Sequence, residues 1–463
     1  MESVIILKSN VLSAGVSSVD ITPDQNVSMV GYGPRTSESI SDELLVNALV
    51  VFSDKIEWLL LTADIFGIDL DSSGKIRSII SKTLRIQESQ ITISCSHSHS
   101  GPATFHLRET RKDENYILFM QEAFVSAAVR AKENIQSVYW SFGVGECDEN
   151  VSRRKTVNGV TEMDINNSGL KDSRVRVLRM DSIENAEKNF PLCIVVHYAC
   201  HPTVTGGEGK ISSDWPGAMR REIETHYSSE NGKPTICFIQ GCAGDITHRI
   251  GKDKQRWPDH FGIQTYSQAE IMGTKVARTV IETSEKSANF SAVNLNIALK
   301  PLKLKFLHSC QSEKIQVQMV SISGSNSAKN RESVDIVFIM LPVEPFASYG
   351  MDLGILFQNR FGYHRDRIIV CGYSNGLVGY LGYPKSIIEG GYETEKAHFY
   401  YHRPGPFSIG SRSRILSTSL KLARTISGNN VSNIKKVVFL LKSRLTDSYY
   451  FFLYHSKNIF SII

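Results

Sequence analysis

The sequence lacks the features of several classes of protein. It has no run of about 18 uninterrupted apolar residues, so we expect no transmembrane helix. Its 52 basic and 47 acidic residues leave a net charge of only +5, with no basic stripe, which argues against a nucleic-acid-binding protein. The N-terminus has no basic lead and too short an apolar core for a signal peptide. With 41% hydrophobic and 21% charged residues, the chain is not mostly disordered.

Cysteine motifs are missing too. The chain has eight cysteines but no CxxC pair. Four lie inside or beside apolar runs, as Cys193 does in PLCIVV and Cys237 in TICFIQ, which is typical of buried free thiols. We therefore expect neither a zinc knuckle nor a disulfide framework, and we predict a cytoplasmic protein in a reducing compartment.

What the sequence does have is an alternation of short apolar segments with helical stretches between residues 12 and 425. This pattern predicts an α/β fold, built as one large domain whose β-sheets are covered by helices. Several segments are apolar on both faces, which indicates central strands with helices on both sides. The expected strands are 90–95, 193–200, 235–240, 335–341 and 367–371.

Three further segments have local signals. A helix is expected from Asp214, which can cap it, with Pro216 in its first turn and apolar residues at 219, 223 and 227. The polar stretch 321–335 is typical of an exposed loop between two strands. The tail at 426–463, rich in aromatic and β-branched residues, is compatible with two extra strands, an interfacial segment or an appendage.

Each expected strand runs into a turn that carries polar side chains. Ligands of α/β proteins gather outside the carboxyl ends of the strands, so we expect these turns to lie close together. The turns are SHSHSGP (96–102), HYACHPT (197–203), QGCAGDITHR (240–249), LPVEPF (341–346) and YSNGLVGY (373–380).

Histidines and one carboxylate stand out in these turns. Residues two apart share a face of a strand, so His97 and His99 should emerge together beyond Ile91, Ile93 and Cys95. Such a pair suits a metal ion or a substrate, but two satisfied loop histidines are an equal alternative. His201 precedes Pro202 at the end of the next strand, whereas His197 lies deeper and is typical of a hydrogen-bonded core histidine. Glu344, taken alone, is typical of a surface acid.

These segments together resemble the neutral (alkaline, non-lysosomal) ceramidase family, over about residues 12 to 400. The resemblance implies the fold of that family's N-terminal catalytic domain. The motifs that carry it, in chain order, are AGVSSVDITP (14–23), MVGYGP (29–34), LLTADIFG (60–67), SHSHSGPA (96–103), ACHPTV (199–204), ISSDWPG (211–217), QGCAGDITHR (240–249), LPVEPF (341–346) and NGLVGYLGYPKSIIEGGYE (375–393).

The resemblance implies a single zinc ion. Its ligands, carried over residue by residue, are His97, His201, Glu344 and Tyr380. Nitrogen and oxygen ligands suit zinc, and a catalytic site keeps one position open for water. His99 would carry a proton near the leaving amine. Arg153 would stabilise an oxyanion or hold a polar substrate group, with a surface salt bridge as the alternative. Thr247 stands where the family has a serine, so the resemblance makes it a third candidate catalytic residue beside His99 and Arg153.

Several positions depart from the family pattern. The residues after Thr247 are His248 and Arg249 in place of Pro-Asn, and Val343 replaces a glycine. About 60 residues follow position 400, too few for the family's additional β-sandwich. The last motif has lost most of its threonines and paired glutamates, whose places are taken by Gly382, Tyr383, Lys385 and Ser386.

The resemblance implies a zinc-dependent hydrolase that cleaves an N-acyl amide, either ceramide (N-acylsphingosine) or a related compound, by metal-activated water. The partner would be a small N-acyl amide or a lipid, and the tail offers a route to peripheral membrane contact. A non-catalytic relative that binds a metal or ligand is one alternative. A hydrolase with Thr247, Cys242 or Cys95 as nucleophile is another, although no G-x-S-x-G elbow is present.

Overall fold

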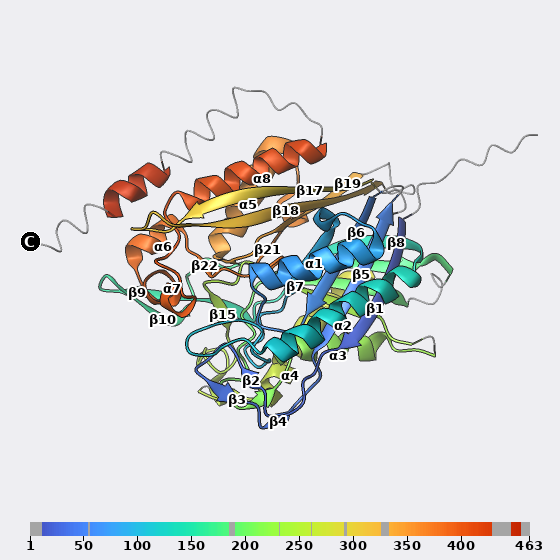
Figure 1. Cartoon of the computed structure of the whole chain (residues 1–463), viewed down its shortest axis with the longest axis horizontal. Helices are drawn as coiled ribbons and strands as arrows, with labels where there is room; N and C mark the ends of the chain where they lie inside the picture. Colours follow the sequence, from blue (N-terminus) through green and yellow to red (C-terminus); the bar gives the residue numbers. More distant parts are fainter. Residues whose placement is uncertain are drawn as a thin grey trace, which may run out of the picture.

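The computed structural model describes residues 12–53, 56–184, 190–230, 232–260, 262–290, 294–325, 333–427 and 446–454. Two β-sheets pack face to face, and helices cover their outer sides, so the layers run helix, sheet, sheet, helix (Figure 1). This arrangement confirms the predicted α/β class, with β-sheets covered by helices.

The larger sheet is mixed, and only two of its strand pairs are parallel: β12 with β14, and β6 with β7. Its strands, in spatial order, are β14 (Thr235–Gln240), β12 (Pro191–Tyr198), β11 (Arg174–Ser182), β8 (Gln136–Glu146), β1 (Leu12–Asp20), β5 (Leu45–Ser53), β6 (Ile56–Ala63) and β7 (Ile91–Cys95), with β16 (Asn289–Phe290) beside β8.

The smaller sheet has four strands, and its last pair is parallel. The strands, in spatial order, are β17 (Asn294–Lys305), β18 (Ser312–Ser325), β19 (Ser333–Met340) and β21 (Ile368–Cys371). Strands β18 and β19 extend into the stretch 321–335, so the predicted loop is shorter than expected, and its remainder, 326–332, lies outside the described residues.

An apolar layer between the two sheets is the centre of the fold. Trp58 of the larger sheet lies against Phe338 of the smaller one, with ring centroids 5.3 Å apart, and both are fully buried. Val195 and Cys237 also face this layer. The expectation that helices cover both faces of the central strands is therefore wrong in one respect. A second sheet covers one face, because apolar side chains on a strand fit a sheet as well as a helix.

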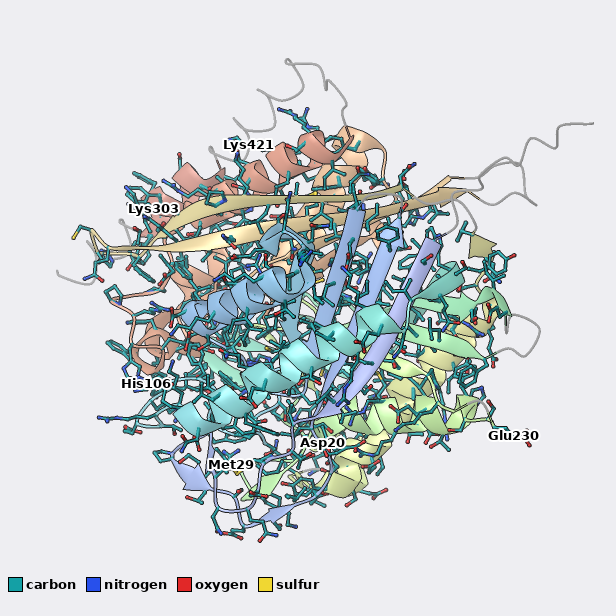
Figure 2. The ribbon with its side chains drawn as sticks, turned by 45° about the vertical axis from the view of Figure 1, so that its right-hand side comes forward. Asp20, Met29, His106, Glu230, Lys303 and Lys421 are labelled. Atoms are coloured by element: carbon teal, nitrogen blue, oxygen red, sulfur yellow. The ribbon has the colours of Figure 1, made fainter. Side chains whose placement is uncertain are left out.

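Three pairs of helices cover the outer faces. The helices α1 (Leu70–Leu84) and α2 (Glu114–Glu133) lie on strands β1, β5, β6 and β7, as Figure 2 shows from the front. Helices α3 (Asp214–Tyr227) and α4 (Tyr266–Lys286) cover β11, β12 and β14. Helices α5 (Ala347–Phe361) and α8 (Ser411–Ser427) cover the smaller sheet. None of the described helices is long and apolar enough to cross a membrane.

Helix α3 begins where the sequence predicts, but its cap differs. Ser213 is the N-cap residue and makes no capping hydrogen bond with its side chain. Asp214 is the first helical residue, at φ +59°, and its carboxylate accepts hydrogen bonds from the backbone N–H groups of Trp215 and Thr205. The acid therefore ties the preceding loop to the helix start.

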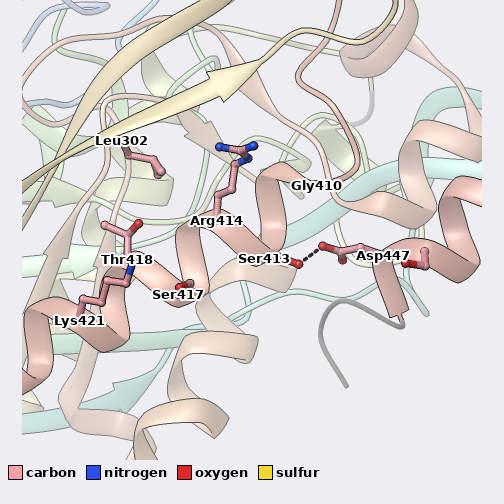
Figure 3. A pocket seen from close by; sticks show the side chains of 9 residues that line it. Leu302, Gly410, Ser413, Arg414, Ser417, Thr418, Lys421 and Asp447 are labelled. Atoms are coloured by element: carbon pink, nitrogen blue, oxygen red, sulfur yellow. Dashed lines mark hydrogen bonds between the residues drawn. The ribbon is translucent and has the colours of Figure 1, made fainter. Parts of the chain in front are cut away.

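The described part of the tail is a helix, 446–454, that packs against the domain. Asp447 accepts a hydrogen bond from Ser413 of α8, beside a groove that also borders Lys421 (Figure 3). Tyr450 and Tyr454 pack on a small apolar cluster around Ile409. Whether the rest of 426–463 adds strands lies outside the described residues.

Candidate metal centre

The five polar turns meet at one place, as predicted. The Nε2 atoms of His97 and His201 lie 3.3 Å and 3.4 Å from Oε2 of Glu344. Tyr373 Oη donates to the same oxygen at 3.3 Å, and His201 Nδ1 lies 2.7 Å from the carbonyl oxygen of Ala243. All five residues are buried. Residues from distant parts of the chain therefore form one enclosed cluster beyond the strand ends.

The histidine pair comes together in a different way from the one predicted. Strand β7 ends at Cys95, and His97 has a left-handed backbone at φ +71°, so the alternation of faces stops before the histidines. Ile91, Ile93 and Cys95 pack under α1 and α2 as expected. The ring centroids of His97 and His99 are still 4.9 Å apart.

Backbone carbonyls set the tautomers of the two inner histidines. The Nδ1 atom of His97 lies 2.8 Å from the carbonyl oxygen of Phe66. A carbonyl oxygen only accepts, so Nδ1 of both His97 and His201 carries the proton, and both Nε2 atoms present a lone pair. Neither Nε2 has a hydrogen-bond partner. Burial, and after it Arg153, lowers the pKa of His201 to about 3, which keeps its ring neutral.

The side chain of His99 is less buried than those of His97 and His201, and its ring makes no hydrogen bond. Both of its ring nitrogens are enclosed and have no hydrogen-bond partner. Burial lowers the pKa of His99 well below its ordinary value, and His97 and His201 lower it further. One nitrogen from each of the three histidines lies within 4.8 Å of the others, so His99 is placed for either proton transfer or metal binding.

Glu344 is fully buried, so its interpretation as a surface acid is wrong. Burial would raise the pKa of its carboxyl, but the adjacent rings of His97 and His201 hold that pKa well below its ordinary value. Tyr401 donates a hydrogen bond to Oε1, while Tyr373 donates to Oε2. The sequence interpretation missed both tyrosines, because no local pattern marks a hydroxyl that donates to a distant carboxylate.

Tyr380 lies beside Glu344 through the short parallel pair of β20 (Glu344–Pro345) and β22 (Tyr380–Leu381). Its Oη accepts a hydrogen bond of 3.0 Å from Arg153. Burial, and then Glu344, raises the pKa of the Tyr380 hydroxyl. The phenol is therefore neutral unless a cation is added nearby.

Arg153 is buried, which rules out a surface salt bridge. Its Nε donates to Glu393 at 2.9 Å, and one terminal nitrogen donates to Tyr380 and to the carbonyl oxygen of Gly244. Burial opposes the charge, but Tyr380 and Glu393 raise the pKa of Arg153 above its ordinary value. Arg154 pairs with the other oxygen of Glu393 at 2.6 Å, so this acid is shared by two arginines.

The candidate nucleophiles lie outside the histidine cluster. Thr247, in β15 (Ile246–His248), accepts a hydrogen bond of 2.9 Å from Lys252. Burial raises the pKa of the Cys95 thiol to about 12, and burial likewise raises the pKa of Cys242. A thiol held neutral in this way is a poor nucleophile. Thr247 is near the cluster only through its neighbour Ile246, whose carbonyl oxygen lies 3.1 Å from His201 Nδ1.

His197 is a core histidine, as predicted. Its Nε2 lies 3.1 Å from the carbonyl oxygen of Val370, and Arg176 lies 3.4 Å from its Nδ1. Burial lowers its pKa to about 3, with Arg176 adding to the effect. It holds β12 against β21 rather than serving the site.

The donor atoms fit a zinc ion. Two oriented, unpartnered Nε2 atoms face a carboxylate oxygen, and histidine and carboxylate are ordinary zinc ligands. Carbonyl groups behind the histidines and hydroxyls behind the carboxylate supply the outer contacts that orient such ligands.

Comparison with solved structures gives the same fold. The structure matches the neutral ceramidase from Pseudomonas aeruginosa with a TM-score of 0.70 and 13% identity, over 90% of this chain and 74% of that chain. It matches a ceramidase complexed with C2 with a TM-score of 0.71 and 13% identity, over 92% and 77%. No family model and no curated protein matches the sequence. The chain thus has a neutral ceramidase-like fold.

Proposed function

We propose that this chain, with its neutral ceramidase-like fold, is a zinc-dependent hydrolase that cleaves the C–N bond of an N-acyl amide. Water adds its oxygen to the carbonyl carbon, the C–N bond breaks, and the nitrogen takes a proton, which releases a carboxylic acid and an amine. The observation that carries the proposal is the meeting of His97 and His201 with Glu344, both Nε2 atoms being unpartnered.

In this proposal the zinc ligands are His97, His201, Glu344 and Tyr380. When bound, zinc would polarise the amide carbonyl and lower the pKa of a water molecule. The carbonyl groups of Phe66 and Ala243 hold the histidine rings in place for that role. Arg153, through its hydrogen bond to Tyr380, favours the ionised phenol and places positive charge near the developing oxyanion.

His99 is the proton carrier in this proposal. Burial keeps its ring neutral at ordinary pH, so one of its unpartnered nitrogens can accept a proton from water. The resulting imidazolium then returns that proton to the nitrogen of the leaving amine. The buried Glu344 nearby stabilises the intermediate positive charge.

Ceramide is one candidate substrate within this class of amides. The fold supports an amide of ceramide type, but the segment 375–393 departs most from the family motif. The helix 446–454 carries exposed Tyr449, Phe451 and Phe452, which support peripheral membrane contact. Seven buried cysteines, all free, support a cytoplasmic location.

The test is hydrolysis of N-acyl amides by purified, zinc-loaded protein, before and after chelation and after zinc is restored. The proposal expects loss with the chelator and recovery with zinc. A hydrolase that used Thr247 or a cysteine without metal would keep its activity, and a non-catalytic relative would have none. Short-chain amides in solution and ceramide in liposomes, compared for the full chain and a chain ending at 445, test the role of the tail.

A further inference from the structure

Arg35 is a cation without a counter-ion beside the histidine cluster. One of its terminal nitrogens donates to the backbone carbonyl of His99, whereas its Nε and its other terminal nitrogen are enclosed and have no partner. Among the described residues, the groups that act on its charge are the hydroxyls of Tyr32 and Tyr266, and no carboxylate pairs with it. A desolvated guanidinium without an anion is costly, so this place favours a negatively charged ligand.

A tight turn fixes Arg35 against the cluster. The strands β2 (Ser28–Met29) and β3 (Arg35–Thr36) pair across it, and Figure 2 places Met29 near the end of the large sheet. Gly31 has φ +112°, and a Cβ there would lie 2.7 Å from the ring of His99. The ring of Tyr32 lies 5.2 Å from that of His99, and the guanidinium lies 4.8 Å above Tyr32. The turn therefore packs directly against the ring of His99.

Lys252 is a second, partly buried cation, on which the charge of Asp214 acts. Lys252 donates to Thr247 at 2.9 Å, and burial, followed by Arg153, lowers its pKa to about 8. The loop that follows His201 contacts both segments. The carbonyl oxygen of Thr203 lies 3.2 Å from His248, four residues before Lys252, and a Cβ at Gly207 would lie 3.8 Å from Tyr32.

The acids in this region are already engaged. Asp214 accepts hydrogen bonds from the backbone N–H groups of Val204, Thr205 and Trp215, and Glu393 is shared by Arg153 and its neighbour. Neither acid acts on the charge of Arg35. No described carboxylate therefore acts on Arg35, whereas Glu344 acts on His99 itself.

We propose that the substrate carries an anion, such as a carboxylate, on the amine side of its amide bond, and that Arg35 binds this anion. The unfilled N–H donors and the fixed charge of Arg35 suit an oxyanion. The proposal rests on the proposed function, because it takes His99 as the residue beside the leaving amine. The substrate class is then an N-acyl amino acid or a similar anionic N-acyl amine.

Three amides with the same acyl chain test this: N-lauroylglycine, N-lauroyltaurine and neutral N-lauroylethanolamine. We expect the glycine amide to exceed the ethanolamide about 10- to 100-fold in kcat/KM, the range for a hydrogen bond to a charged group. The taurine amide separates a carboxylate preference from a preference for any anion. In Arg35→Met the ratio of kcat/KM for the glycine amide to kcat/KM for the ethanolamide should fall toward one. In Arg35→Lys this ratio should be intermediate. Arg278→Met is the control, because Arg278 is exposed and 12 residues, or about 18 Å, along α4 from Tyr266.

Calorimetry on the zinc-free protein separates this inference from the proposed function. We expect N-lauroylglycine to bind at least 10-fold more tightly than N-lauroylethanolamine, with the difference lost in Arg35→Met and kept in Arg278→Met. Equal hydrolysis and equal binding of the two amides would overturn the anion site and leave the hydrolase intact. Preferential binding of the glycine amide without hydrolysis of any amide would support the anion site and overturn the hydrolase.

Discussion

Tyr401 donates a hydrogen bond to Oε1 of Glu344, the carboxylate whose other oxygen faces His97 and His201. Tyr401 follows the short helix α7 (Ala397–Tyr400), and Glu344 stands in β20, so the contact joins two distant segments. A hydroxyl behind a ligating carboxylate fixes its orientation, as the outer contacts of a metal site do.

Removal of this hydroxyl should weaken zinc binding. In Tyr401→Phe we expect the zinc affinity, measured by competition with a chromogenic chelator, to fall about 10- to 100-fold, the range for outer contacts of metal sites. Tyr400→Phe is the matched control, since Tyr400 is the adjacent residue and stacks on Arg108 rather than contacting Glu344. Equal zinc affinity in Tyr401→Phe and the native protein would contradict this supporting role of Tyr401.

His99→Ala separates proton transfer from metal binding. If His99 carries a proton, the variant should lose about 10²- to 10⁴-fold in kcat and keep most of its zinc. His106→Ala is the control, because His106 is exposed and stacks on His402. Loss of zinc from His99→Ala would make His99 a ligand, and unchanged turnover would remove it from the mechanism.

The place of this site could be predicted from the sequence, because it depends on local strand signals, whereas the choice of His97, His201 and Glu344 as ligands came from the family resemblance. The segment 235–240 has the bounds of β14, since an apolar run is bounded there by Pro234 and Gly241. His97, His201 and Glu344 each follow a strand of this kind, and the strand ends bring them together.

Other features could not be predicted, because they depend on packing between distant segments. The apolar face of a strand packs equally well against a helix or a sheet. The sequence therefore did not predict the contact of Trp58 with Phe338 between the two sheets. Tyr401, directly after α7, and Arg35, in the two-residue strand β3, reach the site from short segments in which neither period nor spacing marks a partner. The left-handed backbone of His97 broke the predicted alternation.

Asp245 should make stability depend on pH. It is buried, and burial raises its pKa from 3.8 to about 7, against the hydrogen bond that it accepts from the N–H of Ala347. The raised pKa means that the folded state holds the proton more tightly than the unfolded state. The stability gained in this way is fully present below about pH 4 and is lost as pH rises through about 7.

Asp245→Asn keeps an oxygen acceptor and removes the ionisation. We compare the free energy of unfolding of the variant with that of the native protein by urea unfolding. The difference, variant minus native, should be about 2–3 kcal/mol larger at pH 8 than at pH 5. The exposed Asp24→Asn serves as the control. A difference between native protein and Asp245→Asn that does not change with pH would contradict this origin of the dependence.

The cysteines should be free thiols with one accessible member. Cys310 is exposed, and the other seven are buried. A thiol reagent should therefore label about one cysteine in the native protein and all eight after unfolding without reductant, and Cys310→Ser should remove the native reaction. Two or more disulfides found by mass mapping would contradict both the free thiols and the proposed cytoplasmic location.

The central claim is that His97 and His201 bind one zinc ion that the hydrolysis requires. The most direct measurement is the zinc content per chain by mass spectrometry, together with N-acyl amide hydrolysis, for the native protein, His97→Ala and His201→Ala. The exposed His364→Ala is the control. We expect one zinc per chain in the native protein and the control, and loss of both zinc and activity in the two variants. Full zinc content in both His97→Ala and His201→Ala would contradict the account.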